Sequence, residues 1–299
     1  QWSVVAVVGV VMAILAGHAQ IALYVILTAA VYSLWRLRNF RLSARLHTII
    51  GFRLKLILLA GALLSVAGWL PFLQFLPQTA RLTMAESASR PGWFLPWQNI
   101  IQFIAPDFFG NPATLNYWGV WNYGEFIGYI GLIPLILSAS ALFSGGAASF
   151  WSCAVLIGLF FMLSHPVTMV LQWANLPLVS VLQPTRLMVI VDLGLSILAA
   201  YGLERLLHGK NKNRVVRACM AIGICFVVLW MGVLTSHVWS KDAAVLGNLL
   251  VSRRNLILPT LLYILAIAMI VSLYQPKRGK VFWISAIVVV TIFDLFRFG

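Results

Sequence analysis

Residues 215–236 of the chain read VVRACMAIGICFVVLWMGVLTS, a stretch in which Arg217 is the only charged residue. A bilayer core about 30 Å thick is crossed by roughly 20 apolar residues in a helix, so this stretch is long enough to span a membrane. Eight further stretches come close to the same length. The nine predicted spans are residues 2–16, 19–35, 54–73, 126–143, 147–164, 186–207, 215–236, 256–274 and 281–296.

The composition of the whole chain indicates the same class of protein. Of its 299 residues, 62% are hydrophobic and 9% are charged, whereas soluble domains hold ~45–50% apolar and ~25% charged residues. Only helices and closed barrels satisfy the backbone polar groups in lipid, and these uniform runs lack the alternation of barrel strands. The sequence therefore predicts an all-α, polytopic transmembrane helix bundle of about nine spans, in one membrane-embedded domain over residues 1–299.

The chain opens on Gln1 within an apolar pattern, and Gly299 directly follows the last predicted span. We therefore expect further sequence on both sides. The net charge of +14 does not indicate nucleic acid as a partner, because the basic residues lie in short connectors instead of on one soluble face. Cys153, Cys219 and Cys225 have neither a paired spacing nor a nearby histidine, so that no disulfide framework and no zinc site is indicated.

The basic residues predict how the spans are oriented, because short cytoplasmic loops are rich in Lys and Arg. With nine alternating spans, 14 of the 21 Lys and Arg residues fall on one side, in the connectors 36–55, 205–217 and 275–280. We take this side as cytoplasmic, which places Asp107 and Glu125 on the outer side. We expect the membrane to be a bacterial cytoplasmic membrane. The outer compartment then lacks ATP and nucleotide sugars, so an outward-facing enzyme would use a lipid-linked substrate.

Residues 74–125 form the longest connector between predicted spans, and loops of this length are usually functional or disordered. The apolar content of this loop argues against disorder. Residues 96–110 read PWQNIIQFIAPDFFG, with Pro96 placed to start a helix and Pro106 to end it. We expect this short helix to lie in the membrane interface, within a loop on the outer side.

The same loop is rich in aromatic residues, among them Tyr117 and Trp118. Aromatic rings can pack on the C–H faces of sugars, while their N–H and O–H groups reach the hydroxyls. They also form the aromatic belt of a membrane interface, which needs no ligand. Asn111 lies at a predicted tight turn, which suits both interpretations. We take Tyr117, Trp118 and Asn111 as candidate substrate contacts.

Asp107, Glu125 and Glu86 are the candidate catalytic residues. Desolvation raises the pKa of a carboxyl group near an apolar boundary, and such a group can act as a general base or bind a divalent ion such as Mg²⁺ or Mn²⁺. Asp107 could instead cap the turn that follows it, and Glu125 could mark the start of the next span. Both interpretations stay open.

Arg81 and Arg90 flank Glu86 within RLTMAESASR, residues 81–90. Two guanidinium groups at a membrane surface are suited to binding a phosphate bidentately. The same pattern is typical of an exposed helix with weak ion pairs. We take Arg81 and Arg90 as candidate phosphate contacts.

His18 and Gln20 interrupt an apolar run that is too long for one span, and they therefore predict an outer hairpin. His18 could contact a phosphate or satisfy backbone groups at the turn. Arg186 begins the span 186–207 at the outer boundary, and Asp192 lies inside it. Ionisable groups within a span usually face the bundle interior and are candidates for a functional site, although Asp192 could simply bond to another helix. All four are candidate substrate-binding residues.

Several of these motifs together resemble the YfhO family of bacterial membrane proteins. They are GHAQIALY at residues 17–24, AESASRP at 85–91, the pieces APDFFGNP, YWG and NYGEFIGYIGLIPL within 105–135, and QPTRLMVIVDLGLSILAAYGLERL at 183–206. The block within 105–135 is the most specific. That family is similar to the GT-C glycosyltransferases, which transfer a sugar from a polyprenyl-phosphate donor to an acceptor on the outer face.

The resemblance implies a membrane enzyme that modifies an envelope polymer such as teichoic acid. An acidic side chain would deprotonate the acceptor hydroxyl, directly or with a divalent ion, while basic groups stabilise the departing lipid phosphate. It assigns the acceptor or sugar site to Asp107, Glu125 and Glu86, and the donor phosphate to Arg186, Arg90, Arg81 and His18. In the superfamily an important acid lies in the first outer loop, which we expect upstream of Gln1.

Two other functions remain open at this point. A transporter or flippase of a lipid-linked glycan would need polar groups that continue through the bundle, of which Asp192 is one. A non-catalytic assembly subunit would use the outer loop only to bind a partner enzyme.

Overall fold

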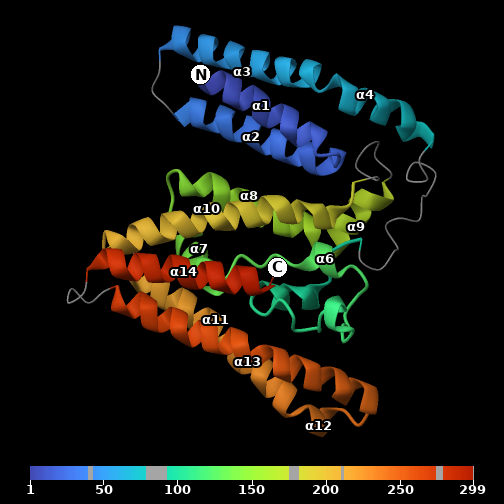
Figure 1. The fold of residues 1–299 in the computed structure, drawn as a ribbon, viewed down its shortest axis with the longest axis vertical. Coiled ribbons are helices and arrows are strands. Elements are labelled where there is room, and N and C mark those ends of the chain that lie inside the picture. Colours follow the sequence, from blue (N-terminus) through green and yellow to red (C-terminus); the bar gives the residue numbers. More distant parts are fainter. Residues whose placement is uncertain (40–42, 79–92, 175–181, 210–211, 274–278, 299) are drawn as a thin grey trace. The chain divides into compact units, whose positions relative to one another are not determined.

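The computed structural model describes residues 1–39, 43–78, 93–174, 182–209, 212–273 and 279–298, and its elements are helices. The all-α prediction is therefore confirmed. The helices, drawn in Figure 1, are α1 (Trp2–Leu15), α2 (Ala19–Asn39), α3 (Ala44–Leu64), α4 (Val66–Phe75), η1 (Leu76–Gln78), η3 (Trp97–Phe103), η4 (Pro112–Thr114), α6 (Tyr123–Phe126), α7 (Leu132–Ala141), α8 (Ala148–Met162), α9 (Pro166–Trp173), η5 (Pro184–Leu187), α10 (Met188–Leu207), α11 (Lys212–Leu234), α12 (Ser236–Trp239), α13 (Ala243–Ser272) and α14 (Lys280–Phe298).

Five of the described helical segments are long and apolar enough to cross a membrane. They are Ala19–Asn39, Arg45–Leu64, Pro184–Leu207, Lys212–Leu234 and Ala243–Ser272. The other predicted spans correspond to the shorter apolar helices α1, α7 and α8 and to the 19-residue helix α14. The chain is thus compatible with a multi-pass membrane protein, and the count of nine spans stays a prediction.

The predicted span 54–73 is divided between two helices. α3 begins earlier than predicted and ends at Leu64, and α4 follows after Ser65. The Ser65 hydroxyl donates to the Gly61 carbonyl oxygen at 2.7 Å, a backbone contact that bends helices. Pro71 in α4 lacks the N–H that would extend the helical ladder.

Helix α13 begins 13 residues before the predicted span 256–274. The Asp242 carboxylate accepts a hydrogen bond from the Ala244 N–H at 2.8 Å and so caps its first turn. The added turns contain Ser252, Arg253, Arg254 and Asn255. Because these residues are polar, hydropathy did not predict that they belong to the helix.

The chain forms two compact units. Unit 1 comprises residues 1–94 and 161–190, and unit 2 comprises residues 95–160 and 191–299. In unit 1, α1 contacts both α2 and α3, which are its neighbours in Figure 1. The predicted single domain over residues 1–299 stays a prediction.

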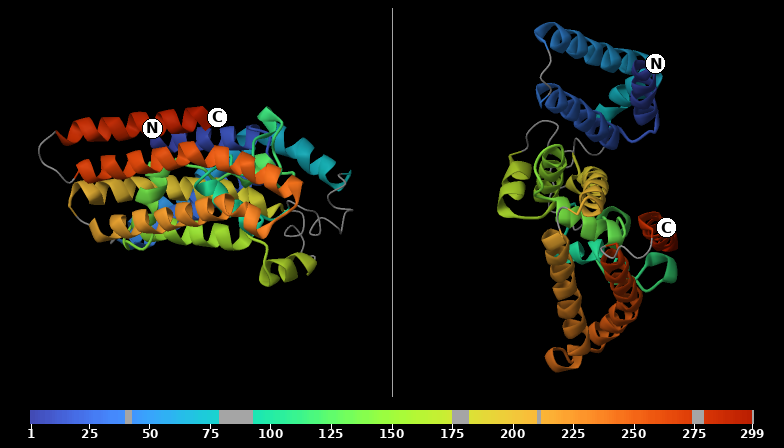
Figure 2. Two further views of the ribbon diagram at one scale, coloured as in Figure 1. Left: turned by 90° about the horizontal axis from the view of Figure 1, so that it is seen from below. Right: turned by 90° about the vertical axis from the view of Figure 1, so that its left-hand side faces the viewer.

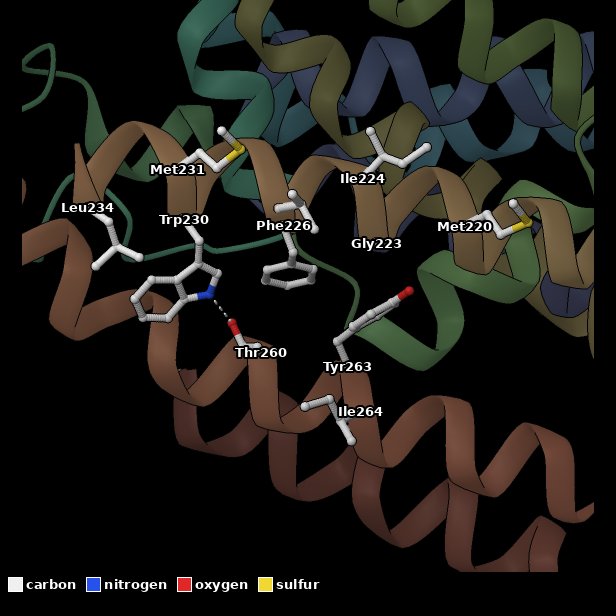
Figure 3. A pocket seen from close by; sticks show the side chains of 11 residues that line it. Met220, Gly223, Ile224, Phe226, Trp230, Met231, Leu234, Thr260, Tyr263 and Ile264 are labelled. Carbon is white, nitrogen blue, oxygen red and sulfur yellow. Dashed lines mark hydrogen bonds between the residues drawn. The ribbon is translucent and has the colours of Figure 1, made fainter. Parts of the chain in front are cut away.

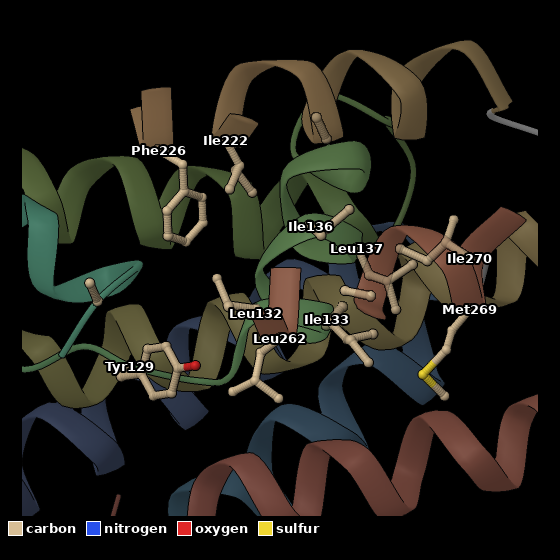
Figure 4. Close-up of a cluster of buried hydrophobic side chains, with 14 of the residues drawn as sticks. Tyr129, Leu132, Ile133, Ile136, Leu137, Ile222, Phe226, Leu262, Met269 and Ile270 are labelled. Carbon is tan, nitrogen blue, oxygen red and sulfur yellow. The ribbon is translucent and has the colours of Figure 1, made fainter. Parts of the chain in front are cut away.

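In unit 2, the short helix α7 is the centre of the core and contacts α11, α13 and α14. The right-hand view of Figure 2 shows α11 and α13 diverging from the short helix α12. Apolar side chains from these helices meet in the cluster of Figure 4, which includes Leu132, Ile136, Ile222, Leu262 and Ile270.

One end of unit 2 gathers basic residues. Arg205 donates to the Ser144 carbonyl oxygen at 3.0 Å, and Arg214 donates to that of Phe143 at 2.9 Å. Lys280 donates to the Leu207 carbonyl oxygen at 3.2 Å. These contacts bring the uncharged connector between α7 and α8 to the predicted basic side. We call this the basic end, and the opposite end, which holds Asp107, Glu125 and Asp294, the acidic end.

Asp294 positions the start of α7 at the acidic end. Its buried carboxylate accepts hydrogen bonds from the Tyr129 hydroxyl at 2.8 and 2.7 Å and from the Leu132 N–H at 3.2 Å. A carboxylate at a helix N-terminus is stabilised by the free N–H groups there. The predicted span 126–143 therefore becomes helical only at Leu132, after Gly131 with φ +90°.

Gly202 allows α10 to approach α7 closely. A Cβ atom at this position would lie 2.2 Å from the Leu137 carbonyl oxygen, whereas a Cβ on Gly232 in α11 would meet nothing within 4 Å. Helix packing at membrane depth depends on such small residues. The two glycines therefore form a matched pair for testing this contact.

We expect Gly202→Ala to destabilise the protein by about 1–3 kcal/mol, because the backbone atoms it meets cannot move aside cheaply. Gly232→Ala has the same gain of ~1 kcal/mol in helix propensity as Gly202→Ala, but its new Cβ meets no neighbour. The Gly232→Ala protein should therefore be at least as stable as the wild type. The apparent midpoint of thermal unfolding in detergent measures both. Equal midpoints for Gly202→Ala and the wild type would contradict the close contact.

Candidate functional site

The loop that follows η3 is attached to α13 by two side chains. The buried Ser252 hydroxyl donates to the Phe108 carbonyl oxygen at 2.7 Å, and the Asn255 amide donates to the Asp107 carbonyl oxygen at 2.6 Å. Ser252 and Asn255 are three residues apart and thus lie on one face of the helix. The position of Asp107 relative to α13 is therefore set through its own backbone.

The Asp107 carboxylate is held on one oxygen. Oδ1 accepts hydrogen bonds from the Tyr123 hydroxyl at 2.8 Å and from the Asn111 amide at 3.0 Å. Among the described residues, none donates to Oδ2. Asp107 is only half-buried, so that Oδ2 is available to a hydroxyl group that donates a hydrogen bond.

Tyr123 is neutral in this arrangement. Burial raises the pKa of the Tyr123 phenol above its ordinary value, and the hydrogen bond to Asp107 and the negative charge of Asp107 raise it further. The phenol therefore stays protonated at neutral pH and donates to the carboxylate. Burial also raises the pKa of Tyr117, whose ring packs edge-on against Tyr123 with 5.1 Å between the ring centres.

Asn111 is a structural part of this cluster. Its amide donates to Asp107 and to the Tyr123 hydroxyl, and its Oδ1 accepts from the Ala113 N–H at 2.9 Å. The predicted tight turn is confirmed, since Gly110 has φ +82° and a Cβ there would lie 2.2 Å from the Asn116 carbonyl oxygen. Because its polar atoms are occupied within the loop, Asn111 orients Asp107. Its predicted contact with substrate stays a prediction.

The aromatic side chains divide into packed and exposed groups. Trp118 packs edge-on against Phe109, and its buried indole N–H has no partner in the described part of the chain. Tyr117 donates its hydroxyl to the Val120 carbonyl oxygen. Trp97 and Trp121 are 55% and 67% exposed. These two rings are the more exposed ones, while Tyr117 and Trp118 are partly buried, and the predicted contact of Tyr117 and Trp118 with substrate stays a prediction.

The predicted short helix is present as η3, a 3₁₀ helix from Trp97 to Phe103. Two of its three polar side chains point inward, since Asn99 is buried and donates to the Gln102 amide oxygen at 2.6 Å. Gln102 in turn donates to the Pro106 carbonyl oxygen at 3.0 Å. Trp97 and Ile100 are exposed. Gln98 is exposed beside them, so the outer surface of η3 is mixed, as suits a helix at the interface between lipid and water.

Glu125 belongs to the short helix α6, together with Tyr123. It accepts a hydrogen bond from the Asn122 amide at 3.2 Å. α7 begins only at Leu132, so Glu125 does not mark the start of that helix. The described residues contain no group of three His, Cys, Asp or Glu side chains that could hold a metal ion, and the expected divalent ion stays a prediction.

A second polar cluster lies in unit 1, around Gln20. The Gln20 amide donates to the Gln183 carbonyl oxygen at 2.8 Å and to the Tyr24 hydroxyl at 2.9 Å, and Gln20 Oε1 accepts from Arg186 Nη1 at 3.0 Å. The fold thus brings Gln20 and Arg186 together, and their predicted contact with substrate stays a prediction. His18 Nδ1 accepts from the Ile21 N–H at 3.3 Å, so that it caps the hairpin between α1 and α2.

Asp192 lies on α10, and its Oδ1 is buried without a partner in the described part of the chain. It is near the face of α10 that carries the buried residues Met188 and Leu195. The remaining predicted site residues, Glu86, Arg81 and Arg90, lie outside the described residues.

The sequence pattern named Tyr123 only among the aromatic residues that could pack on a sugar, and it did not single out Ser252 or Asn255. Ser252 and Asn255 carry one usable signal, since polar residues three apart on a helix predict a bonding face. The hydrogen bond from Tyr123 to Asp107 has no signal in the sequence, because it depends on how the loop folds back on itself.

We expect Tyr123→Phe to lower the stability of the protein by about 1–2 kcal/mol, because it removes a donor to a charged acceptor. The control is Tyr201→Phe, since the Tyr201 hydroxyl makes no hydrogen bond among the described residues. A double-mutant cycle with Asp107→Asn, followed by thermal unfolding, should give a coupling energy of about 1 kcal/mol. Additive effects would show that the two side chains do not interact.

In comparisons with known proteins, no protein-family model, no curated protein and no solved structure matches this chain.

Proposed function

We propose that the chain is an outward-facing membrane glycosyltransferase, which moves a sugar from a polyprenyl-phosphate donor to a hydroxyl group of an envelope polymer such as teichoic acid. The observation that supports this most directly is the Asp107 carboxylate, with one oxygen held by Tyr123 and Asn111 and the other available. The resemblance of residues 105–135 to the YfhO family supports the same function.

In this proposal, the acceptor hydroxyl donates to Asp107 Oδ2 and transfers its proton there as its oxygen bonds to the anomeric carbon of the sugar. The bond between that carbon and the phosphate oxygen breaks, and the lipid phosphate departs with the bonding electrons. Tyr123 keeps the carboxylate oriented. Separately, within unit 1, Gln20 holds the guanidinium group of Arg186, which we keep as a candidate phosphate contact.

The exposed rings of Trp97 and Trp121 supply flat surfaces for the sugar or for the lipid interface at the same end of unit 2. Glu125 is a second carboxylate on the helix that carries Tyr123, and we assign it to sugar hydroxyls. The proposed location is a bacterial cytoplasmic membrane, with the acidic end of unit 2 facing outward.

A transporter of lipid-linked glycans is the alternative that a specific observation favours. Asp192 presents a buried carboxylate oxygen without a partner inside a candidate span, and intramembrane acids of this kind often serve as proton or ion sites. Sugar transfer should depend on Asp107, whereas transport should depend on Asp192. Mutation of each residue therefore distinguishes the two functions.

We expect Asp107→Asn to reduce glycosylation of the envelope polymer by about 100-fold, since a general base contributes ~10²–10⁴-fold. Sugar released by hydrolysis of purified polymer measures the effect at equal protein level. Asp242→Asn is the matched control, because asparagine caps α13 as aspartate does. Full glycosylation in Asp107→Asn, together with its loss in Asp192→Asn, would reject transfer in favour of transport.

The proposed sidedness has its own test. In a variant without Cys153, Cys219 and Cys225, Thr114→Cys should react with a membrane-impermeant maleimide in intact cells, because Thr114 is exposed at the acidic end. His208→Cys, exposed at the basic end, should react only after the membrane is opened. Labelling in the reverse order would invert the orientation and place Asp107 in the cytoplasm.

A further inference from the structure

An open groove of about 560 Å³ separates α11 from α13 in unit 2. Figure 3 shows its apolar lining, to which α11 contributes Met220, Ile224, Val227 and Met231 and α13 contributes Ile264. Each of these five side chains is more than half exposed. The α11 residues recur every three or four positions and thus form one continuous stripe.

The polar groups in the groove are already satisfied within the protein. Trp230 donates its indole N–H to the Thr260 hydroxyl at 2.9 Å, and Tyr263 donates its hydroxyl to the Cys219 carbonyl oxygen at 2.7 Å. Gly223 makes room for Tyr263, since a Cβ there would lie 2.6 Å from the phenol oxygen. The groove therefore offers apolar contact and no open polar partner, which excludes a sugar as its occupant.

The two helices that form the groove indicate that it faces lipid. Both are candidate membrane spans. The stripe from Met220 to Leu234 is about 21 Å long at ~1.5 Å per residue, so it is longer than one leaflet of a core about 30 Å thick. A hydrocarbon chain lying along the stripe would bury apolar surface on both helices.

Helix periodicity places Arg253 just beyond one end of this groove. It precedes Thr260 by seven residues, which is about two helical turns, so it shares the groove face some 10 Å nearer the acidic end. Its side chain is exposed, and no hydrogen bond or ion pair among the described residues involves it. The next residue, Arg254, is also exposed but lies about 100° around the helix.

The depth of Arg253 matches that of a lipid phosphate. Helix α13 has 30 residues, or about 45 Å, so it exceeds the hydrocarbon core by about 15 Å. The 18 residues from Asn255 to Ser272 suffice to cross the core, and Arg253 lies just beyond them. Lys241, Arg253 and Arg254 outnumber the single acid of this segment, Asp242, so the local charge is positive.

We propose that the groove between α11 and α13 binds an anionic phospholipid from the leaflet at the acidic end. One acyl chain lies along the α11 stripe, and the phosphate accepts hydrogen bonds from the Arg253 guanidinium group. This site lies on a different face of α13 from Ser252 and Asn255, and it does not depend on the proposed transferase activity or on the sidedness of the chain.

The proposal is tested by native mass spectrometry of the full chain in detergent, titrated with phosphatidylglycerol or with phosphatidylcholine of the same acyl chains. We expect one phosphatidylglycerol to be retained about tenfold more tightly than phosphatidylcholine. Val227→Trp fills the groove and should weaken this retention by about tenfold or more. Val228→Trp is the matched control, because Val227 and Val228 are 58% and 62% exposed and only Val227 lines the groove.

The charge at this end of the groove is tested by a second pair of variants. Arg253→Gln should remove the preference for phosphatidylglycerol, whereas Arg254→Gln should keep it. Equal effects within either pair, or equal retention of the two phospholipids by the wild type, would overturn the proposal. Retention of a polyprenyl phosphate without retention of phosphatidylglycerol would also overturn it and would give the groove to an isoprenoid chain.

Discussion

The candidate site depends on two hydrogen bonds from α13 to consecutive carbonyl groups, those of Asp107 and Phe108. Because Ser252 and Asn255 bond to the backbone of the loop, they hold its path without using the Asp107 carboxylate. Hydrogen bonds of this kind are strengthened where water is scarce, as at a membrane boundary. The carboxylate is thus presented from a fixed backbone while its own oxygens remain free for Tyr123, Asn111 and a ligand.

Helix α13 meets three different surroundings along its length. Leu256 and Leu262 enter the core around α7, Ser252 and Asn255 bind the loop, and Tyr263 faces the groove beside α11. A helix with 3.6 residues per turn can separate such roles within a few turns. Any change that rotates or shifts α13 would therefore alter both the loop that carries Asp107 and the groove.

The sequence predicted the fold class because hydrophobicity in a span is a local property that each stretch carries by itself. It placed Asp107 and the turn at Asn111 correctly in a structured loop, whereas the hydrogen bond between Arg186 and Gln20 came only from the fold. It missed the early start of α13, since polar residues there serve the loop. It also missed the division of residues 54–73 at Ser65, where a side chain competes for backbone hydrogen bonds.

Residue order alone thus determined that this chain is helical and apolar, and which of its connectors carry the basic residues. Only the tertiary structure decided which groups meet. Asn255 and Asp107 are 148 positions apart, and Asp294 is separated from Tyr129 by 165. Periodicity encodes the inward face of a helix but not the partner it will meet. Those partners follow from how helices pack, with Gly202 and Gly223 fixing how closely two of the pairs approach.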